Sequence, residues 1–191
     1  MPRRTATRVR IRRATLRDLD VLVRQRRGMW EDIADHTEAE LDAADRVYRQ
    51  WTRRRMKSGK LVGFLAETRD GRVVSGGCVW LQEIQPMPGR PDRVQPYLLS
   101  MYTEPEFRGR GLATRIVREA IRWSKARGYF RLSLHASDFG RAIYQRQGFK
   151  RSWEMRVRLR PRPRGRARPR SPRRRLAASR RPGARGTRAS R

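Results

Sequence analysis

The chain of 191 residues contains one cysteine, two histidines and only four lysines. A single cysteine cannot form an internal disulfide, which excludes a disulfide-stapled secreted domain. One cysteine and two histidines also supply too few ligands for a structural zinc site, so we expect no metal. No apolar run approaches the roughly 20 residues that a membrane span needs. The basic N-terminus lacks the apolar stretch that follows the charges of a signal peptide. We therefore expect a cytoplasmic protein with no membrane segment.

Arginine dominates what is present. Lys and Arg number 49 against 18 Asp and Glu, which gives a formal net charge of +31. Residues 160–191 alone contain 14 Arg, five Pro and no acid. Because this segment cannot bury a core, we predict that it is a disordered basic tail. Two explanations of the tail stay open: it contacts nucleic acid through phosphates without sequence preference, or it reflects the Arg-rich coding of a GC-rich genome.

The body of the chain, residues 1–159, keeps a formal net charge of +17 and enough apolar residues to bury a core. Apolar residues at helical or alternating spacing, together with capping and turn residues, indicate where its elements lie. Helices are predicted from capping boxes at Thr15 and Thr37, over 112–124 and over 138–147. Strands are predicted over 7–15, 61–68, 72–85, 97–103, 131–136 and 150–159. This order indicates one mixed sheet with helices on its faces, an α/β or α+β fold.

The segment Met101–Thr114 runs from a strand through a turn with two glycines directly into a helix. The first turn of a helix has free backbone N–H groups, and glycines let a phosphate approach them, so this geometry favours anion binding. Arg108 and Arg110 add positive charge. On the glycine spacing alone, an ordinary exposed turn fits equally well. Two familiar phosphate loops are excluded, because no Gly-Lys-Ser/Thr occurs and the dinucleotide fingerprint fails at Thr114.

Arg108-x-x-Gly111-x-Ala113 resembles the Gln/Arg-x-x-Gly-x-Gly/Ala pyrophosphate loop of the GNAT N-acetyltransferase superfamily. Downstream, Ile143-Tyr144-Gln-Arg-Gln-Gly148-Phe149 resembles the Leu-Tyr-x-x-x-Gly-Phe motif of the same family. The resemblance covers roughly residues 7–159. It implies a GNAT domain over 1–159, with a mixed sheet of about six to seven strands flanked by about four helices.

The resemblance also implies an activity, namely transfer of the acetyl group of acetyl-CoA to a primary amine of a small molecule or peptide, by direct attack in a ternary complex. The loop N–H groups would hold the pyrophosphate, and the end of the preceding strand would pair with pantetheine. A backbone N–H there would polarise the thioester carbonyl. The implied cofactor-binding residues are Met101, Tyr102, Thr103, Arg108, Gly109, Arg110, Gly111, Ala113, Thr114 and Ser137.

Tyr144 would protonate the departing CoA thiolate, since a phenol is neutral at pH 7 and can donate a proton. Packing of an aromatic ring in the core is its alternative role. For the general base we favour Glu83, followed by Glu31. Glu104 is a further candidate that also fits a surface turn, and His135 could reach the cleft, although a lone histidine on a strand is more often structural.

The acceptor is less constrained by the sequence. Residues 31–45 hold seven acids and no Lys or Arg, and such a cluster would attract a cationic amine. Acids at the starts of helices also interact favourably with the helix dipole, which is the alternative interpretation of this cluster.

A rival function stays open as well: a nucleic-acid- or ribosome-associated basic protein that uses the acetyltransferase fold as a module. A homodimer is compatible with the resemblance.

Overall fold

One mixed β-sheet runs through the first of two structural units, Met1–Glu154 and Met155–Arg191. The computed structural model describes residues 9–86, 88–89, 93–157 and 159. The strands are β1 (Val9–Arg13), β2 (Leu61–Thr68), β3 (Val73–Glu83), β4 (Val94–Thr103) and β5 (Ser133–Leu134), in this order across the sheet. The first four strands pair antiparallel, whereas β5 pairs parallel to β4.

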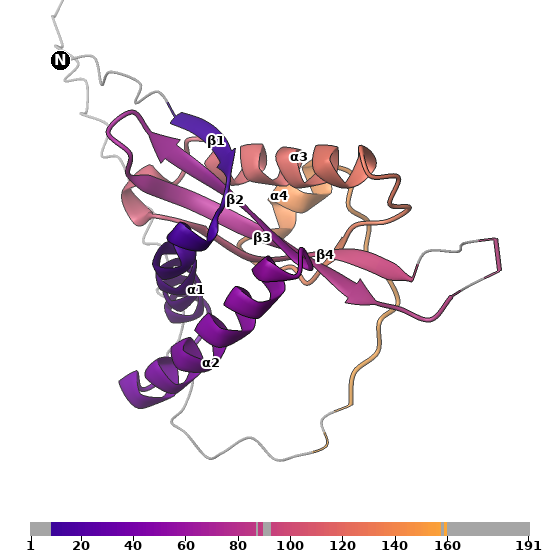
Figure 1. Ribbon diagram of the computed structural model, residues 1–191, viewed down its shortest axis with the longest axis horizontal. Coiled ribbons are helices and arrows are strands. Elements are labelled where there is room, and N and C mark those ends of the chain that lie inside the picture. Colours follow the sequence, from indigo (N-terminus) through magenta and orange to yellow (C-terminus); the bar gives the residue numbers. More distant parts are fainter. Residues whose placement is uncertain (1–8, 87, 90–92, 158, 160–191) are drawn as a thin grey trace, which may run out of the picture. The chain divides into compact units, whose positions relative to one another are not determined.

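Helices cover both faces of the sheet. They are α1 (Leu19–Ile33), α2 (Glu38–Lys57), α3 (Leu112–Lys125) and α4 (Arg141–Arg146), with short 3-10 turns at Leu16–Asp18 and Pro105–Phe107. Figure 1 shows α1 and α2 on one side of the sheet and α3 and α4 on the other. Both predicted capping boxes are confirmed, because the side chains of Thr15 and Thr37 accept backbone N–H groups of the helices that they precede. The predicted α/β fold is therefore confirmed.

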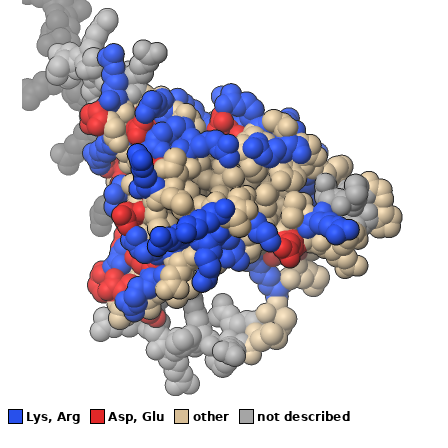
Figure 2. Space-filling view, viewed as in Figure 1, with Lys and Arg blue, Asp and Glu red and all other residues tan. Residues whose placement is uncertain are grey.

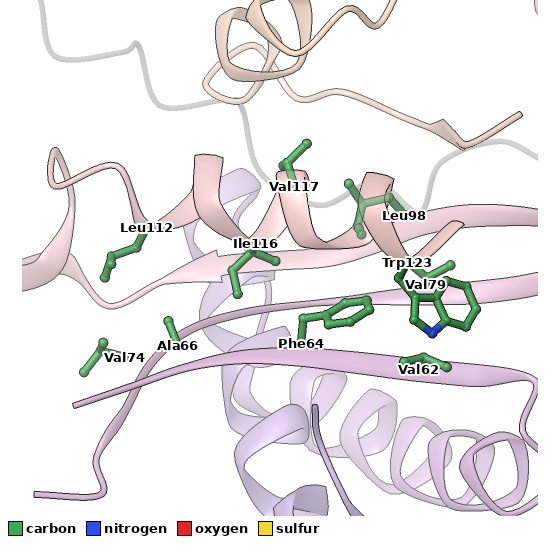
Figure 3. Packing of buried hydrophobic residues seen from close by; sticks show 11 residues of the cluster. Val62, Phe64, Ala66, Val74, Val79, Leu98, Leu112, Ile116, Val117 and Trp123 are labelled. Carbon is green, nitrogen blue, oxygen red and sulfur yellow. The ribbon is translucent and has the colours of Figure 1, made fainter. Parts of the chain in front are cut away.

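The two faces of the sheet are packed by two separate apolar clusters. Ile116 and Val117 of α3 are both fully buried. Figure 3 shows Ile116 pointing toward the strands, where Phe64 of β2 lies, and Val117 pointing away from them. On the opposite face, Leu22 of α1 packs with a cluster that includes Leu65. Every residue of β2 is buried, as expected for a strand with helices on both sides. These clusters fix the helices against the strands that carry the site.

The predicted strand over 150–159 is wrong. Residues 150–157 form no strand, and Trp153 and Met155 in that segment are 97% and 94% exposed. Alternation of apolar and charged residues suits a strand, but a strand also needs a neighbour to pair with. Within the described part of the chain the sheet therefore has five strands, rather than six to seven. The predicted tail, 160–191, lies outside the described residues. No helix in the described ranges is both long and apolar enough to cross a membrane.

Candidate functional site

The edge of β4 is open at its C-terminal end. β5 pairs with β4 only at Tyr97 and Leu98, although β4 continues to Thr103. Beyond Leu98, no strand in the described ranges occupies this edge. An extended ligand can pair with such an edge as if it were another strand. The predicted binding residues Met101, Tyr102 and Thr103 all belong to this open segment.

A β-bulge lies in the same segment. Cys78 of β3 pairs with Leu99, whereas Gly76 pairs with Tyr102, so β4 holds one extra residue between these pairs. Ser100 lies in the bulge and is the one non-glycine residue of the described chain with a positive φ, +53°. Bulges leave a residue unpaired in the ladder and often lie beside functional sites. The bulge therefore leaves backbone N–H and C=O groups of β4 outside the pairing with β3, close to the point where β4 and β5 separate.

The loop between β4 and α3 forms a cradle at the start of a helix. Gly109 and Gly111 have φ values of +75° and +74°, and a Cβ at either position would meet no atom within 4 Å. No side chain of the described residues caps α3, and its first turn holds no acid. The backbone N–H groups of that turn, which includes Ala113 and Thr114, therefore form the positive end of α3, with open space before it. We call the segment Arg108–Thr114 the cradle. This geometry fits a phosphate group.

Two arginines lie at the rim of the cradle. The Nε of Arg108 donates to the carbonyl oxygen of Thr103 at 2.9 Å, and its Nη2 lies 2.5 Å from a carboxylate oxygen of Asp32 on α1. Arg110 donates to the carbonyl oxygen of Glu106 at 2.8 Å. Both guanidinium groups are thus held by the protein in positions beside the cradle. The Asp32 contact also places the end of α1 next to the cradle.

Tyr144 of α4 belongs to the apolar cluster on the α3 face of the sheet. Its ring meets that of Phe149 edge to face, with 5.9 Å between the ring centroids. Gly140 lies so close that a Cβ there would be 2.8 Å from the Tyr144 ring. Burial raises the pKa of Tyr144, so its hydroxyl stays protonated at neutral pH and can donate a proton. Ser137 precedes α4, and its hydroxyl accepts the N–H of Gly140 at 3.3 Å.

Each carboxylate considered as a general base has a basic partner in the structure. Glu83 ends β3 opposite the first residue of β4, on the order of 30 Å along the strand from Thr103. Its Oε1 lies 2.5 Å from the Nζ of Lys60, which lowers the pKa of Glu83. Glu31 lies 3.3 Å from Arg27. The structure does not bring Glu83 to the cradle.

Most of the acidic cluster over 31–45 is also paired. The guanidinium of Arg27 contacts four of its carboxylates, those of Glu31, Glu38, Asp42 and Asp45. Glu40 belongs to the capping box of α2. Four carboxylates share one guanidinium, so this group keeps an excess of negative charge. Figure 2 shows Lys and Arg over much of one face, with the acidic side chains mainly along one side.

A hydrogen-bonded chain that spans β4 and β5 was not predicted from the sequence. The hydroxyl of Tyr97 contacts Nδ1 of His135, and Nε2 of His135 lies 2.8 Å from Oε1 of Glu154. Sequence reasoning weighed His135 as an isolated residue, because its partners are 38 and 19 positions away. No local signal could have indicated this group.

Comparison with known proteins identifies relatives of this architecture. A model of the acetyltransferase (GNAT) family matches residues 23–149. No match is found among the curated proteins. Among solved structures, a GCN5-related N-acetyltransferase from Ralstonia eutropha is 25% identical, with a TM-score of 0.73 over 80% of this chain and 99% of that one. A predicted acetyltransferase from Clostridium acetobutylicum, solved with acetyl-CoA, is 24% identical. Its TM-score is 0.72, and the match covers 80% of this chain and 97% of that one. An aminoglycoside N-acetyltransferase solved with CoA is 19% identical. Its TM-score is 0.62, and the match covers 85% of this chain and 99% of that one.

Proposed function

Because this chain belongs to the GNAT acetyltransferase family, we propose that it transfers the acetyl group of acetyl-CoA to a primary amine. The observation that carries this proposal is the cradle at the uncapped start of α3, which directly follows the open edge of β4. A phosphate site and an edge for amide pairing, placed one after the other, match the two polar parts of CoA. Acetyl-CoA supplies a thioester, whose carbonyl carbon the amine attacks.

The cradle binds the pyrophosphate of acetyl-CoA in this proposal. Backbone N–H groups from Arg108 to Gly111, and those of Ala113 and Thr114, donate to the phosphate oxygens, and the helix end favours their charge. The side chains of Arg108 and Arg110 add charge at the rim, where their positions are already held by hydrogen bonds. The open space at Gly109 and Gly111 supports this role because a phosphate needs close approach to the backbone.

The open edge of β4 orients the pantetheine arm. Backbone groups over Met101–Thr103 pair with its amides, which directs the thioester toward the bulge at Ser100. A backbone N–H that the bulge releases from the ladder donates to the thioester carbonyl oxygen. Such a donor stabilises the negative charge that develops on this oxygen during attack, and the loss of one such donor typically slows an enzyme by about 10²–10³-fold.

Tyr144 donates a proton to the sulfur of the leaving thiolate. Two observations support this assignment: its place on α4 beside α3 and the burial that keeps its hydroxyl protonated. Ser137 contributes by shaping the turn that starts α4, through its bond to the N–H of Gly140, and contacts the cofactor there.

The acceptor is a primary amine of a small molecule or peptide, and a cationic amine suits the site best. Arg108 of the cradle forms an ion pair with Asp32 at the end of α1. The end of α1 and the start of α2 therefore flank the donor site. The carboxylates around Arg27 keep an excess of negative charge there. A local negative potential raises the concentration of a cationic substrate near the site.

The test combines binding and turnover. Calorimetry with acetyl-CoA at rising salt separates specific binding from attraction to a net charge of +31, and a panel of amines then reveals the acceptor. The variant Tyr144→Phe should keep its affinity for acetyl-CoA and lose about 100-fold in kcat, the usual scale of general acid catalysis.

Tyr129→Phe is the matched control, because Tyr129 packs against the same apolar cluster without a role in the reaction. Its turnover should equal that of the unmodified protein. Equal turnover of Tyr144→Phe would remove Tyr144 from the mechanism, and binding of acetyl-CoA that disappears at 0.3 M salt would contradict the donor site.

A further inference from the structure

Tyr97, His135 and Glu154 form a continuous hydrogen-bonded chain beside the candidate site. The Tyr97 hydroxyl contacts Nδ1 of His135, and Nε2 of His135 lies 2.8 Å from the carboxylate of Glu154. Because a carboxylate accepts, we assign the proton of the neutral imidazole to Nε2. Nδ1 is then unprotonated and accepts the hydroxyl proton of Tyr97. The chain is therefore polarised in one direction, from the phenol toward the carboxylate.

The chain lies where β4 and β5 separate. The two strands pair for the last time at Leu98 and Leu134, so Tyr97 precedes this point and His135 follows it. The ring centroids of Tyr97 and His135 are 5.6 Å apart. Because β4 and β5 run parallel with Tyr97 opposite Ser133, His135 lies further along in the direction of Leu99, and the phenol that contacts it points the same way. The side chains of His135 and Glu154 are 47% and 54% exposed, so a ligand can reach the chain.

The side-chain alternation of both strands fixes the face on which the chain lies. Leu98 and Leu134 pack into the cluster on the α3 face, so their neighbours Tyr97 and His135 point to the opposite face. Ser100 also faces that side, since its hydroxyl lies 3.3 Å from the hydroxyl of Tyr48 on α2. Tyr144, in contrast, packs on the α3 face. The two proton-handling groups thus lie on opposite faces of the opening between β4 and β5.

We propose that Tyr97, His135 and Glu154 are the proton-accepting relay of the acetyl transfer, an inference that rests on the proposed function. In this proposal the amine approaches from the α1 and α2 side, and Tyr97 is the catalytic residue that meets it. His135 and Glu154 act through Tyr97 as positioning residues. Opposite faces suit the reaction, because the amine and the departing sulfur lie on different sides of the carbonyl carbon.

The proton balance of the step is complete. A cationic amine first releases one proton through Tyr97 and His135 to solvent, which makes it a neutral nucleophile. Its nitrogen then forms a bond to the thioester carbonyl carbon and gives a second proton to the Tyr97 oxygen, while the Tyr97 proton passes to Nδ1 of His135. Glu154 stabilises the resulting imidazolium through Nε2–H. The carbon–sulfur bond breaks, and the sulfur receives the proton of Tyr144. Solvent then takes the proton from His135 and returns one to Tyr144.

The carboxylates considered as bases lack this arrangement. Glu83 is engaged by Lys60 at the far end of β4, and Glu31 belongs to the group around Arg27. Glu104 directly follows β4 and lies 3.8 Å from Arg24, whereas β4 and β5 part at Leu98. The relay instead begins next to that point and ends on a carboxylate that can stabilise a positive charge on His135.

The first experiment needs no substrate. Nitrogen-15 NMR of the imidazole rings in the full-length protein reports which nitrogen carries the proton. We expect the Nε2–H tautomer for His135, and we expect Glu154→Gln to weaken this preference. A neutral His135 protonated at Nδ1 would overturn the relay, because Nδ1 could not then accept from Tyr97.

The second experiment follows kcat/KM against pH for Tyr97→Phe and His135→Asn. At pH 7 the kcat/KM of both variants should be about 100-fold lower, with unchanged affinity for acetyl-CoA. This difference should shrink as pH rises, because a larger fraction of the amine is then already neutral. A merely structural role predicts the same loss at every pH, which would overturn the proposal. Tyr129→Phe is again the matched control, since Tyr129 packs against the apolar cluster on the α3 face, and it should leave the pH profile unchanged.

The two proposals fail in different ways. Absence of acetyl-CoA binding to the unmodified protein overturns the proposed function. Acetyl transfer by the unmodified protein, together with full activity of Tyr97→Phe and His135→Asn, overturns only the relay.

Discussion

Replacement of Gly111 by alanine separates the function of the cradle from the strain of its backbone. Gly111 has a φ of +74°, and a Cβ added there would meet no atom within 4 Å. The substitution therefore causes no clash, and its cost is the left-handed conformation of an L-residue, about 1–2 kcal/mol. We expect the free energy of unfolding of Gly111→Ala to fall by this amount, measured by urea denaturation.

Gly71 offers a matched control in the turn between β2 and β3. Its φ is +83°, and a Cβ there would also meet no atom within 4 Å. Gly71→Ala should therefore lose the same 1–2 kcal/mol of stability. The turn between β2 and β3 lies outside the cradle, so acetyl-CoA affinity should not change in this variant.

Affinity for acetyl-CoA distinguishes the two variants. When the substituted residue at position 111 relaxes toward a negative φ, the N–H groups that follow it turn away from the phosphate. Loss of one hydrogen bond to a charged group costs about 1.5–3 kcal/mol, which corresponds to roughly 10- to 150-fold weaker binding. Calorimetry at 0.15 M and 0.3 M salt measures this difference. The reasoning is refuted if Gly111→Ala binds as tightly as the unmodified protein, or if Gly71→Ala weakens binding equally.

Two further predictions concern the rim of the cradle and the core. Asp32→Asn removes the carboxylate that shares Arg108, so acetyl-CoA should bind up to about fivefold more tightly at low salt, the scale of a partly exposed ion pair; calorimetry that shows weaker binding would contradict this. Cys78 is fully buried, which raises its pKa from 9.0 to about 12, so thiol reagents at pH 8 should label it only when the protein unfolds. Its contribution to stability is complete below pH 9 and falls as pH rises toward 12, by about 1.4 kcal/mol per pH unit, and Cys78→Ala should reduce this alkaline loss in denaturation measurements.

Features that depend on near neighbours in the chain were predictable from the sequence. A capping box involves residues only three apart, and those at Thr15 and Thr37 are present as predicted. The loop from β4 to α3 is equally local, since its two glycines adopt positive φ values without help from distant residues. The short helix that holds Tyr144 was also predictable, because the helix and Gly148, which has a φ of +89°, lie within a few residues of one another.

Features that depend on distant partners were not predictable. Seven acids over 31–45 suggest a free anionic surface. In the structure, however, Arg27 forms ion pairs with four of them, up to 18 positions from it in the sequence. The alternation over 150–159 indicates a strand, but the described residues of that segment, 150–157 and 159, form none. Whether a charge is free or an edge is occupied depends on the assembled fold, and the spacing of residues along one segment does not contain that information.

The shortness of β5 links the donor site to the relay. If β5 paired with β4 beyond Leu98, the strand would occupy the edge that receives pantetheine, and His135 would lie within a closed ladder. Each lost backbone hydrogen bond costs only about 0.5–1.5 kcal/mol net. The buried cluster beneath α3, which includes Ile116 and Trp123, stabilises the sheet independently of these bonds. The fold can therefore leave two strands apart, and in the proposed reaction this opening gives the amine and the thiolate separate faces on which to exchange protons.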